Sequence, residues 1–297
     1  MPDPSWLWAV FTVTAAAAQT VRNAAQRQLT RDLGTVGATH VRFLFGLPFA
    51  LIFLAVVAGA TGAGLPHPSA AFFAWVCTGA ATQIAATAMM LAAMRERSFA
   101  VTIAYTKTEP LQVALFGLVF LGDRLTLPMA AGIVVATGGV FVMSEPPGRS
   151  GSLRPVFLGL AAGGFFALAA VGYRGAIVSL ADPDFLMAAT FTLCVGLLLQ
   201  AAALSLYLLV RERAVLVAIA REWSASLLAG FMGALASQFW FLGFALTTAA
   251  NVRTLALVEV LFAQAVSRFA FRQGTTRREA IGMVLIVVGV ALLLAVQ

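Results

Sequence analysis

Stretches of about 20 apolar residues with few charges recur along the whole of this 297-residue chain. A helix of that length spans the hydrocarbon core of a bilayer, which is roughly 30 Å thick. Hydrophobic residues make up 61% of the chain and charged residues only 10%, against roughly 45–50% and about 25% in soluble domains. A water-soluble fold cannot bury this much apolar surface, so the sequence predicts an all-α membrane protein.

Polar, glycine and proline breaks divide the chain into ten predicted transmembrane helices. Their approximate bounds are 5–26, 35–59, 70–94, 98–121, 126–144, 155–180, 185–210, 223–246, 249–270 and 278–296. The polar segment 211–222 is predicted to be a short amphipathic helix at the membrane interface. The first residues lack the positive region of a secretory signal, so the first apolar segment is expected to stay in the membrane as a helix.

The distribution of arginines predicts the orientation of the chain. Thirteen arginines lie in or at the edges of the loops after the first, third, fifth, seventh and ninth helices, whereas the other side holds only Arg124. The positive-inside rule places the arginine-rich side in the cytoplasm and both termini outside. Membrane topology thus accounts for the net charge of +7 without a nucleic-acid partner, and a bacterial-type cytoplasmic membrane is the expected location.

An internal repeat is predicted from Glu109 and Glu259, the only two acidic residues inside these segments away from their ends, which are 150 residues apart. The same offset aligns two pairs of glycines, Gly132 with Gly282 and Gly139 with Gly289. Glycines seven residues apart share a helix face and let helices approach closely. The alignment predicts two five-helix repeats, 1–147 and 148–297. Because five is odd, the second repeat is inverted, a plan common among secondary transporters with a central cavity.

Both glutamates are expected near the middle of the membrane, about 15 Å from the surface at which their helices enter. A charge that faces lipid at this depth is costly, so each should face the protein interior and have a partner. Lys107 is the only basic residue expected at a similar depth, and Pro110 is expected to bend the helix beside it. Two roles stay open for the glutamates: a structural one, or binding substrate or a proton.

Further polar and aromatic side chains are candidates for the lining of a central cavity. Gln19 and Asn23 share one face of the first helix with Thr12 and Gln26. The predicted substrate-binding residues are Gln19, Asn23, Gln83, Tyr105, Lys107, Glu109, Tyr173, Gln238, Trp240 and Glu259.

Other residues within the predicted helices are assigned structural roles. Arg42, Arg174 and Arg253 are expected to be paired or to extend toward the membrane surface. Cys77 and Cys194 are expected to be small core residues.

Motifs of ATP-driven or metal-dependent enzymes are missing from the sequence. It contains neither a G-x-x-x-x-G-K-[ST] loop nor an H-E-x-x-H pair, which bind phosphates and zinc respectively. The chain is therefore expected not to be an enzyme, to need no cofactor or metal, and to draw on gradients for energy. A channel-like or structural membrane subunit and a membrane enzyme are the alternatives from other classes.

The sequence around Glu109 resembles the EamA repeat of the drug/metabolite transporter superfamily. The resemblance lies in TEPL at 108–111, LGDRLT at 121–126, and Gly132 with Gly139. The second half repeats the pattern around VEVL at 258–261. It departs from the family at Val260, where proline is common, and in RQGTTRRE, which replaces the LGDRLT-like turn.

The resemblance implies a ten-helix secondary transporter that works by alternating access, most similar to the YddG-type exporters of aromatic and other, mostly neutral, amino acids. Drug, nucleotide-sugar and other metabolite carriers of the same superfamily are the alternatives. The implied partners are a small-molecule substrate and the lipid bilayer, and a monomer is compatible with this plan. The basic residues inside the helices are spread over both leaflets, which favours a zwitterionic or neutral substrate over a phosphorylated one.

Overall fold

The computed structural model describes residues 6–96, 102, 105–143, 154–180, 184–262 and 276–295, and every regular element within them is helical. The elements are α1 (Leu7–Leu44), α2 (Gly46–Thr61), α3 (Ala70–Glu96), α5 (Glu109–Phe116), the π-helix η2 (Gly117–Leu121), α6 (Leu127–Met143), α7 (Arg154–Ser179), α8 (Phe185–Arg211), α9 (Arg213–Arg221), α10 (Trp223–Leu246), α11 (Ala249–Leu255) and α13 (Arg277–Leu294). Five helical stretches among the described residues are long and apolar enough to cross a membrane, and three further apolar helices are shorter. The predicted all-α membrane class is confirmed.

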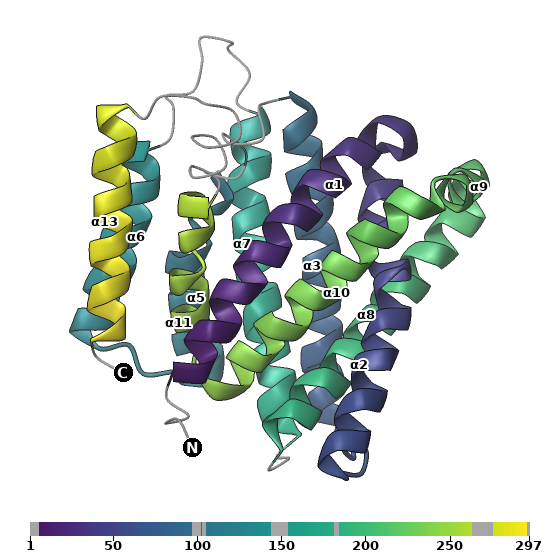
Figure 1. Ribbon diagram of the computed structural model, residues 1–297, viewed down its shortest axis with the longest axis horizontal. Coiled ribbons are helices and arrows are strands. Elements are labelled where there is room, and N and C mark those ends of the chain that lie inside the picture. The colour runs from purple at the N-terminus through teal and green to yellow at the C-terminus, as the bar shows by residue number, and fades with distance from the viewer. Residues whose placement is uncertain are drawn as a thin grey trace.

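Gly34 divides α1 into a long first arm and a short second arm. Its φ of 67° lies in the left-handed region, which glycine reaches without steric cost. The second arm leads through Phe45 into α2, so the chain turns back beside its own first arm (Figure 1). The second predicted segment begins directly after this glycine, but the first was predicted to end too early, at residue 26 instead of just before Gly34.

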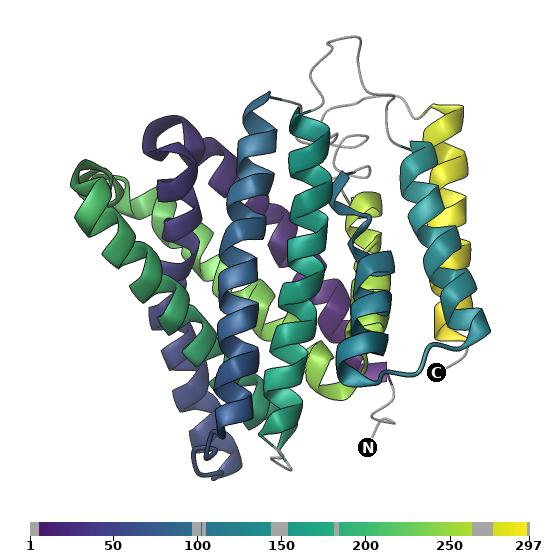
Figure 2. The ribbon, with the colours of Figure 1, turned by 180° about the vertical axis from the view of Figure 1, so that it is seen from behind.

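The helices pack in pairs that are far apart in the sequence. α1 crosses α10, α3 runs along α7, and α6 runs along α13, as the two opposite views show (Figures 1 and 2). α2 packs against α8, and α5 packs against α11. Each pair joins one helix from residues 1–147 to one from residues 148–297, so the core lies between the two halves of the chain.

The α6–α13 contact is built on the glycines that the repeat predicted. Gly132 lies against Gly289 and Gly139 against Gly282. A β-carbon added at Gly139 would lie 2.7 Å from the carbonyl oxygen of Gly282, and one added at Gly132 would lie 2.8 Å from that of Gly289. The backbones of the two helices therefore touch, as helices with small residues on facing surfaces do in membranes.

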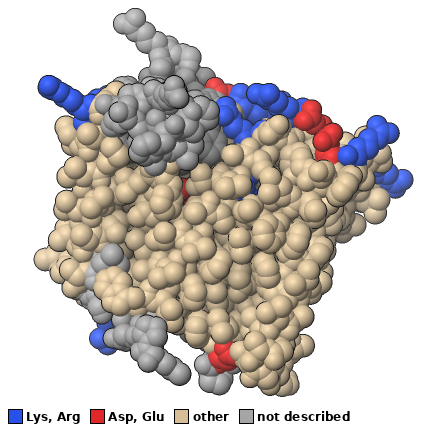
Figure 3. All heavy atoms as spheres, in the orientation of Figure 1, with Lys and Arg blue, Asp and Glu red and all other residues tan. Residues whose placement is uncertain are grey.

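The face seen in Figure 3 is a broad band of mostly uncharged residues with charged side chains gathered at its edges. Lys and Arg gather along the edge at which α9 lies (Figure 3), whereas the start of α1 and the end of α13 lie at the opposite edge (Figure 1). The two cysteines are free. Cys194 is buried as expected, but the prediction of a core position is wrong for Cys77, which is exposed. In a membrane helix an apolar residue can face lipid as readily as protein, so its hydrophobicity did not decide between the two.

Candidate substrate site

The first half of the site lies where the chain enters α5. Lys107 and Thr108 form a turn, and α5 begins at Glu109. Pro110 occupies the first turn of this helix, where a backbone N–H has no helical partner to lose. The helix is thus interrupted beside the charges, as expected, but the irregular residues are Lys107 and Thr108, and Pro110 lies in the first turn of the helix that follows.

The second half of the site is interrupted at the matching place. α11 ends at Leu255, and residues 256–257 form a turn before the helix resumes at Val258. The backbone N–H of Glu259 donates to the carbonyl of Ala256 at 3.0 Å, an i→i+3 bond that tightens the chain. Irregular backbone at membrane depth is tolerated where protein surrounds it, and in transporters such broken helices mark binding sites.

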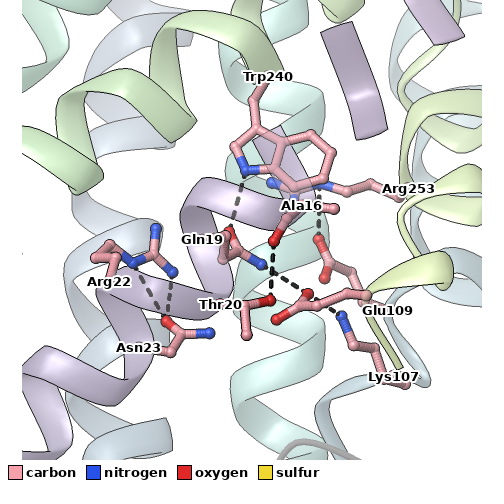
Figure 4. Close-up of polar contacts among 10 residues, drawn as sticks. Ala16, Gln19, Thr20, Arg22, Asn23, Lys107, Glu109, Trp240 and Arg253 are labelled. Atoms are coloured by element: carbon pink, nitrogen blue, oxygen red, sulfur yellow. Dashed lines mark hydrogen bonds and ion pairs between the residues drawn. The ribbon is translucent and has the colours of Figure 1, made fainter. Parts of the chain in front are cut away.

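The charged side chains at these two interruptions form crossed ion pairs. Lys107 Nζ lies 2.6 Å from Glu259 Oε2, and Arg253 Nε lies 3.0 Å from Glu109 Oε1 (Figure 4). All four residues are at most 8% exposed. Each glutamate thus pairs with a basic residue from the other half of the chain, and the prediction that both face the interior with a partner is confirmed.

Gln19 joins the ion pairs to the long crossing helices. Its side-chain amide donates to Glu259 Oε2 at 3.2 Å and accepts from the indole N–H of Trp240 at 3.0 Å. The guanidinium carbon of Arg253 lies 4.6 Å from the centre of a Trp240 ring, a cation–π distance. α1, α10 and α11 therefore share one polar network (Figure 4).

Two further guanidinium groups lie beside this network, those of Arg22 and Arg42. They are 2% and 1% exposed, and a β-carbon added at Gly233 would meet both, Arg42 Cγ at 3.0 Å and Arg22 Cδ at 3.4 Å. The expectation that Lys107 is the only basic residue at this depth is therefore wrong. Depth was counted along straight helices, whereas the break at Gly34 folds the second arm of α1, with Arg42, against the first.

The network surrounds a small cavity of only about 20 Å³, enough for about one water molecule. Its lining residues are Gln19, Arg22, Asn23, Arg42, Gln83, Met90, Thr106, Lys107, Glu109, Phe166, Trp240, Arg253 and Glu259. Seven of the ten predicted substrate-binding residues are among them. Arg42 and Arg253, expected to be paired or to extend toward the surface, also lie here, and only Arg253 has a carboxylate partner among the described residues.

The other three predicted residues lie outside the lining. The Tyr173 hydroxyl donates to Gln83 at 3.1 Å, directly behind the cavity wall. The Gln238 amide donates to Thr190 at 2.7 Å, and Tyr105 packs against Gly159. The described residues contain no group of three His, Cys, Asp or Glu side chains that could hold a metal ion.

Comparison with known proteins gives a family match and a fold match. Residues 6–145 match the EamA-like transporter family. A crystal structure whose description names no protein shares 16% sequence identity with the chain, with a TM-score of 0.71 over 99% of both chains. At this identity the likeness concerns the fold. The search of curated proteins found no match.

Proposed function

We propose that this chain, whose residues 6–145 match the EamA-like transporter family, is a secondary transporter. It exports amino acids or similar small metabolites across the cytoplasmic membrane by alternating access, with the arginine-rich edge in the cytoplasm. The observation that carries this proposal is the small polar cavity between the two halves, lined by both crossed ion pairs. A family of transporters and the absence of enzyme motifs from the sequence both favour transport over catalysis.

An inverted repeat of two five-helix units is part of the proposal. In such a repeat α1, α2, α3, α5 and α6 correspond, in this order, to α7, α8, α10, α11 and α13. The α1–α10 contact then corresponds to the α7–α3 contact. The α2–α8, α5–α11 and α6–α13 contacts each correspond to themselves. The main helix contacts are thus interchangeable between the halves, which is expected for two units related by a two-fold axis in the membrane plane.

The volume of the cavity has a consequence for the mechanism. An amino acid occupies far more than the space of about one water molecule, so the site must open to admit it. A wider hollow of about 640 Å³ lies one helical turn away on the arginine-rich side: Met90 lines the cavity, and Met94, Arg31 and Arg95 line the hollow. This hollow is the proposed cytoplasmic entrance. If the C-terminal end of α3 moved away from the part of α1 that lines the hollow, the hollow and the cavity would join.

Counterflow in proteoliposomes tests the proposal. Purified protein is reconstituted with one unlabelled compound inside, and uptake of the labelled compound is followed for a panel of aromatic, aliphatic and acidic amino acids. A carrier accelerates uptake by exchange and saturates with concentration. A flux that neither saturates nor responds to the internal compound would indicate a channel and contradict the proposal.

Drug, nucleotide-sugar and phosphorylated-metabolite carriers of the same superfamily remain the second candidate. Convergence of four basic side chains on one cavity removes the earlier reason for disfavouring an anionic substrate, since these residues were expected to be spread over both leaflets. Representative compounds of these classes therefore belong in the same counterflow panel.

A further inference from the structure

The charges around the cavity do not balance. Four basic side chains line it, those of Arg22, Arg42, Lys107 and Arg253, but only the two acidic ones of Glu109 and Glu259. Lys107 and Arg253 each have a glutamate partner. Within the part of the chain that the structure describes, two positive charges are therefore left without a carboxylate partner in a place that water barely reaches, and a buried charge without a partner is costly.

Arg22 and Arg42 carry these two charges. No carboxylate of the described residues forms an ion pair with either of them. Arg22 donates through Nε and Nη2 to the side-chain oxygen of Asn23, at 3.2 and 2.6 Å. Arg42 donates to the hydroxyls of Thr87 and Ser237, at 3.3 and 3.4 Å. Their partners are therefore neutral.

Part of the donor capacity of each guanidinium remains unused. Arg22 Nη1 and Arg42 Nε are buried and have no hydrogen-bond partner among the described residues. Glu259 is close enough to attract Arg22, but its Oε2 already accepts from Lys107 and Gln19. Planar guanidinium groups bind carboxylate and phosphate oxygens with paired hydrogen bonds, which is the chemistry that this unused capacity matches.

We infer that Arg22 and Arg42 form an oxyanion subsite that holds the carboxylate or phosphate group of the transported molecule. The inference rests on the proposed transport function and narrows its substrate class. Molecules with such a group, amino acids among them, compensate the unpaired charge, whereas amines, amides and uncharged sugars do not. Trp240 and Phe166 on the same cavity are available for the rest of the molecule.

The test compares compounds that differ only in the oxyanion. Counterflow and thermal stabilisation of the purified protein are measured with phenylalanine against phenylalaninamide, succinate against succinamide, and glycerol 3-phosphate against glycerol. The first two pairs probe a carboxylate and the third a phosphate. Exchange and stabilisation by the oxyanion member of at least one pair, and by neither neutral member, is the expected result.

The variants Arg22→Gln, Arg42→Gln and Arg42→Lys connect this selectivity to the subsite. Loss of one charge-assisted hydrogen-bonding partner should raise the half-saturating concentration about tenfold or more. Lysine keeps the charge but not the planar fork, so Arg42→Lys should fall between the wild type and Arg42→Gln. Arg211→Gln, at an exposed position, is the matched control and should behave as the wild type does.

The outcomes separate the inference from the proposed function. Equal exchange of acids and amides would contradict the subsite but not the carrier function. The same holds if the glutamine variants fold and keep the selectivity of the wild type. Acid-dependent stabilisation that is lost in the glutamine variants, without any exchange, would support the subsite and overturn the carrier. Neither exchange nor stabilisation with any compound of the three pairs would count against both.

Discussion

Lys107 and Glu259, 152 residues apart, form a hydrogen-bonded ion pair at 2.6 Å in the interior of the protein, and Arg253 and Glu109 form a second ion pair beside them at 3.0 Å. Each ion pair joins a residue of one interrupted segment to a residue of the other. The position of each charged side chain therefore depends on both segments. Any motion that separates the two halves at the cavity must break these pairs or carry them along. These two ion pairs therefore hold the two halves together around the cavity in the state that the structure shows.

Replacing one member of the Lys107–Glu259 pair should destabilise the protein far more than replacing both members. Lys107→Met or Glu259→Met leaves one buried charge without its partner and should destabilise the protein by about 3–5 kcal/mol. The double variant removes both charges and should recover much of that loss. Thermal unfolding in detergent of the wild type, both single variants and the double variant measures the coupling.

The pair of Arg154 with Glu96 is the matched control. Its side chains are 71% and 30% exposed, and exposed pairs contribute about 0–1 kcal/mol. Glu96→Gln should therefore leave the unfolding temperature nearly unchanged. Additive losses in the Lys107–Glu259 cycle, without recovery in the double variant, would show that the buried pair is not energetically coupled.

Adjacent glycines of α6 should respond in opposite ways to the same substitution. Gly139→Ala places a β-carbon 2.7 Å from the backbone of α13 and must push the helices apart, whereas at Gly138 nothing lies within 4 Å. Overpacking typically costs about 1–3 kcal/mol, and alanine in an open helical position is favourable by up to about 1 kcal/mol. Thermal unfolding should show a loss for Gly139→Ala and none for Gly138→Ala. Equal effects would contradict the close contact.

Residues of this site could be predicted from the sequence where their residue type is rare within the apolar segments. Glu109 and Glu259 stood out because no other acid lies away from the ends of the predicted membrane segments, and the glycines stood out because their spacing of seven is shared by both halves. Gln19 and Trp240 were found as polar or amphipathic side chains within apolar helices. In each case the lipid environment made the residue type informative.

Arg42 and Arg253 were not predicted to line the cavity, although Arg253 is paired as expected. Their depth was counted at about 1.5 Å per residue along unbroken helices. The turn at 256–257 and the break at Gly34 change where these side chains reach, and the arginine side chain is long. The crossed pairing could not be predicted either, because the sequence gives depths but not which helices are neighbours.

The orientation of the chain can be checked by thiol labelling. In a background of Cys77→Ser and Cys194→Ser, single cysteines replace His67 and Arg213, both exposed. Because the arginine-rich edge is proposed to face the cytoplasm, an impermeant reagent added to intact cells should label position 67 and not position 213. Disruption of the membrane should make both reactive. Labelling of 213 in intact cells would reverse the topology.

Arg22 should show opposite effects on stability and on transport. Arg22→Met removes a buried charge that has no acidic partner, so the unfolding temperature should stay or rise, since stability and function can oppose each other at such sites. Arg253→Met leaves Glu109 unpaired and should destabilise by about 3–5 kcal/mol. Thermal unfolding and counterflow are measured on both. Strong destabilisation by Arg22→Met would mean that its charge is compensated within the protein.

Alternating access to the central cavity is the claim on which the whole account depends, and the accessibility of position 23 tests it most directly. Asn23→Cys, in the cysteine-free background, places a thiol on the cavity wall. The protein is reconstituted and treated with an impermeant thiol reagent applied from either side of the membrane. The account predicts reaction from both sides, each slowed by the substrate found in the counterflow panel. Reaction from one side alone, whether or not substrate is present, would contradict it.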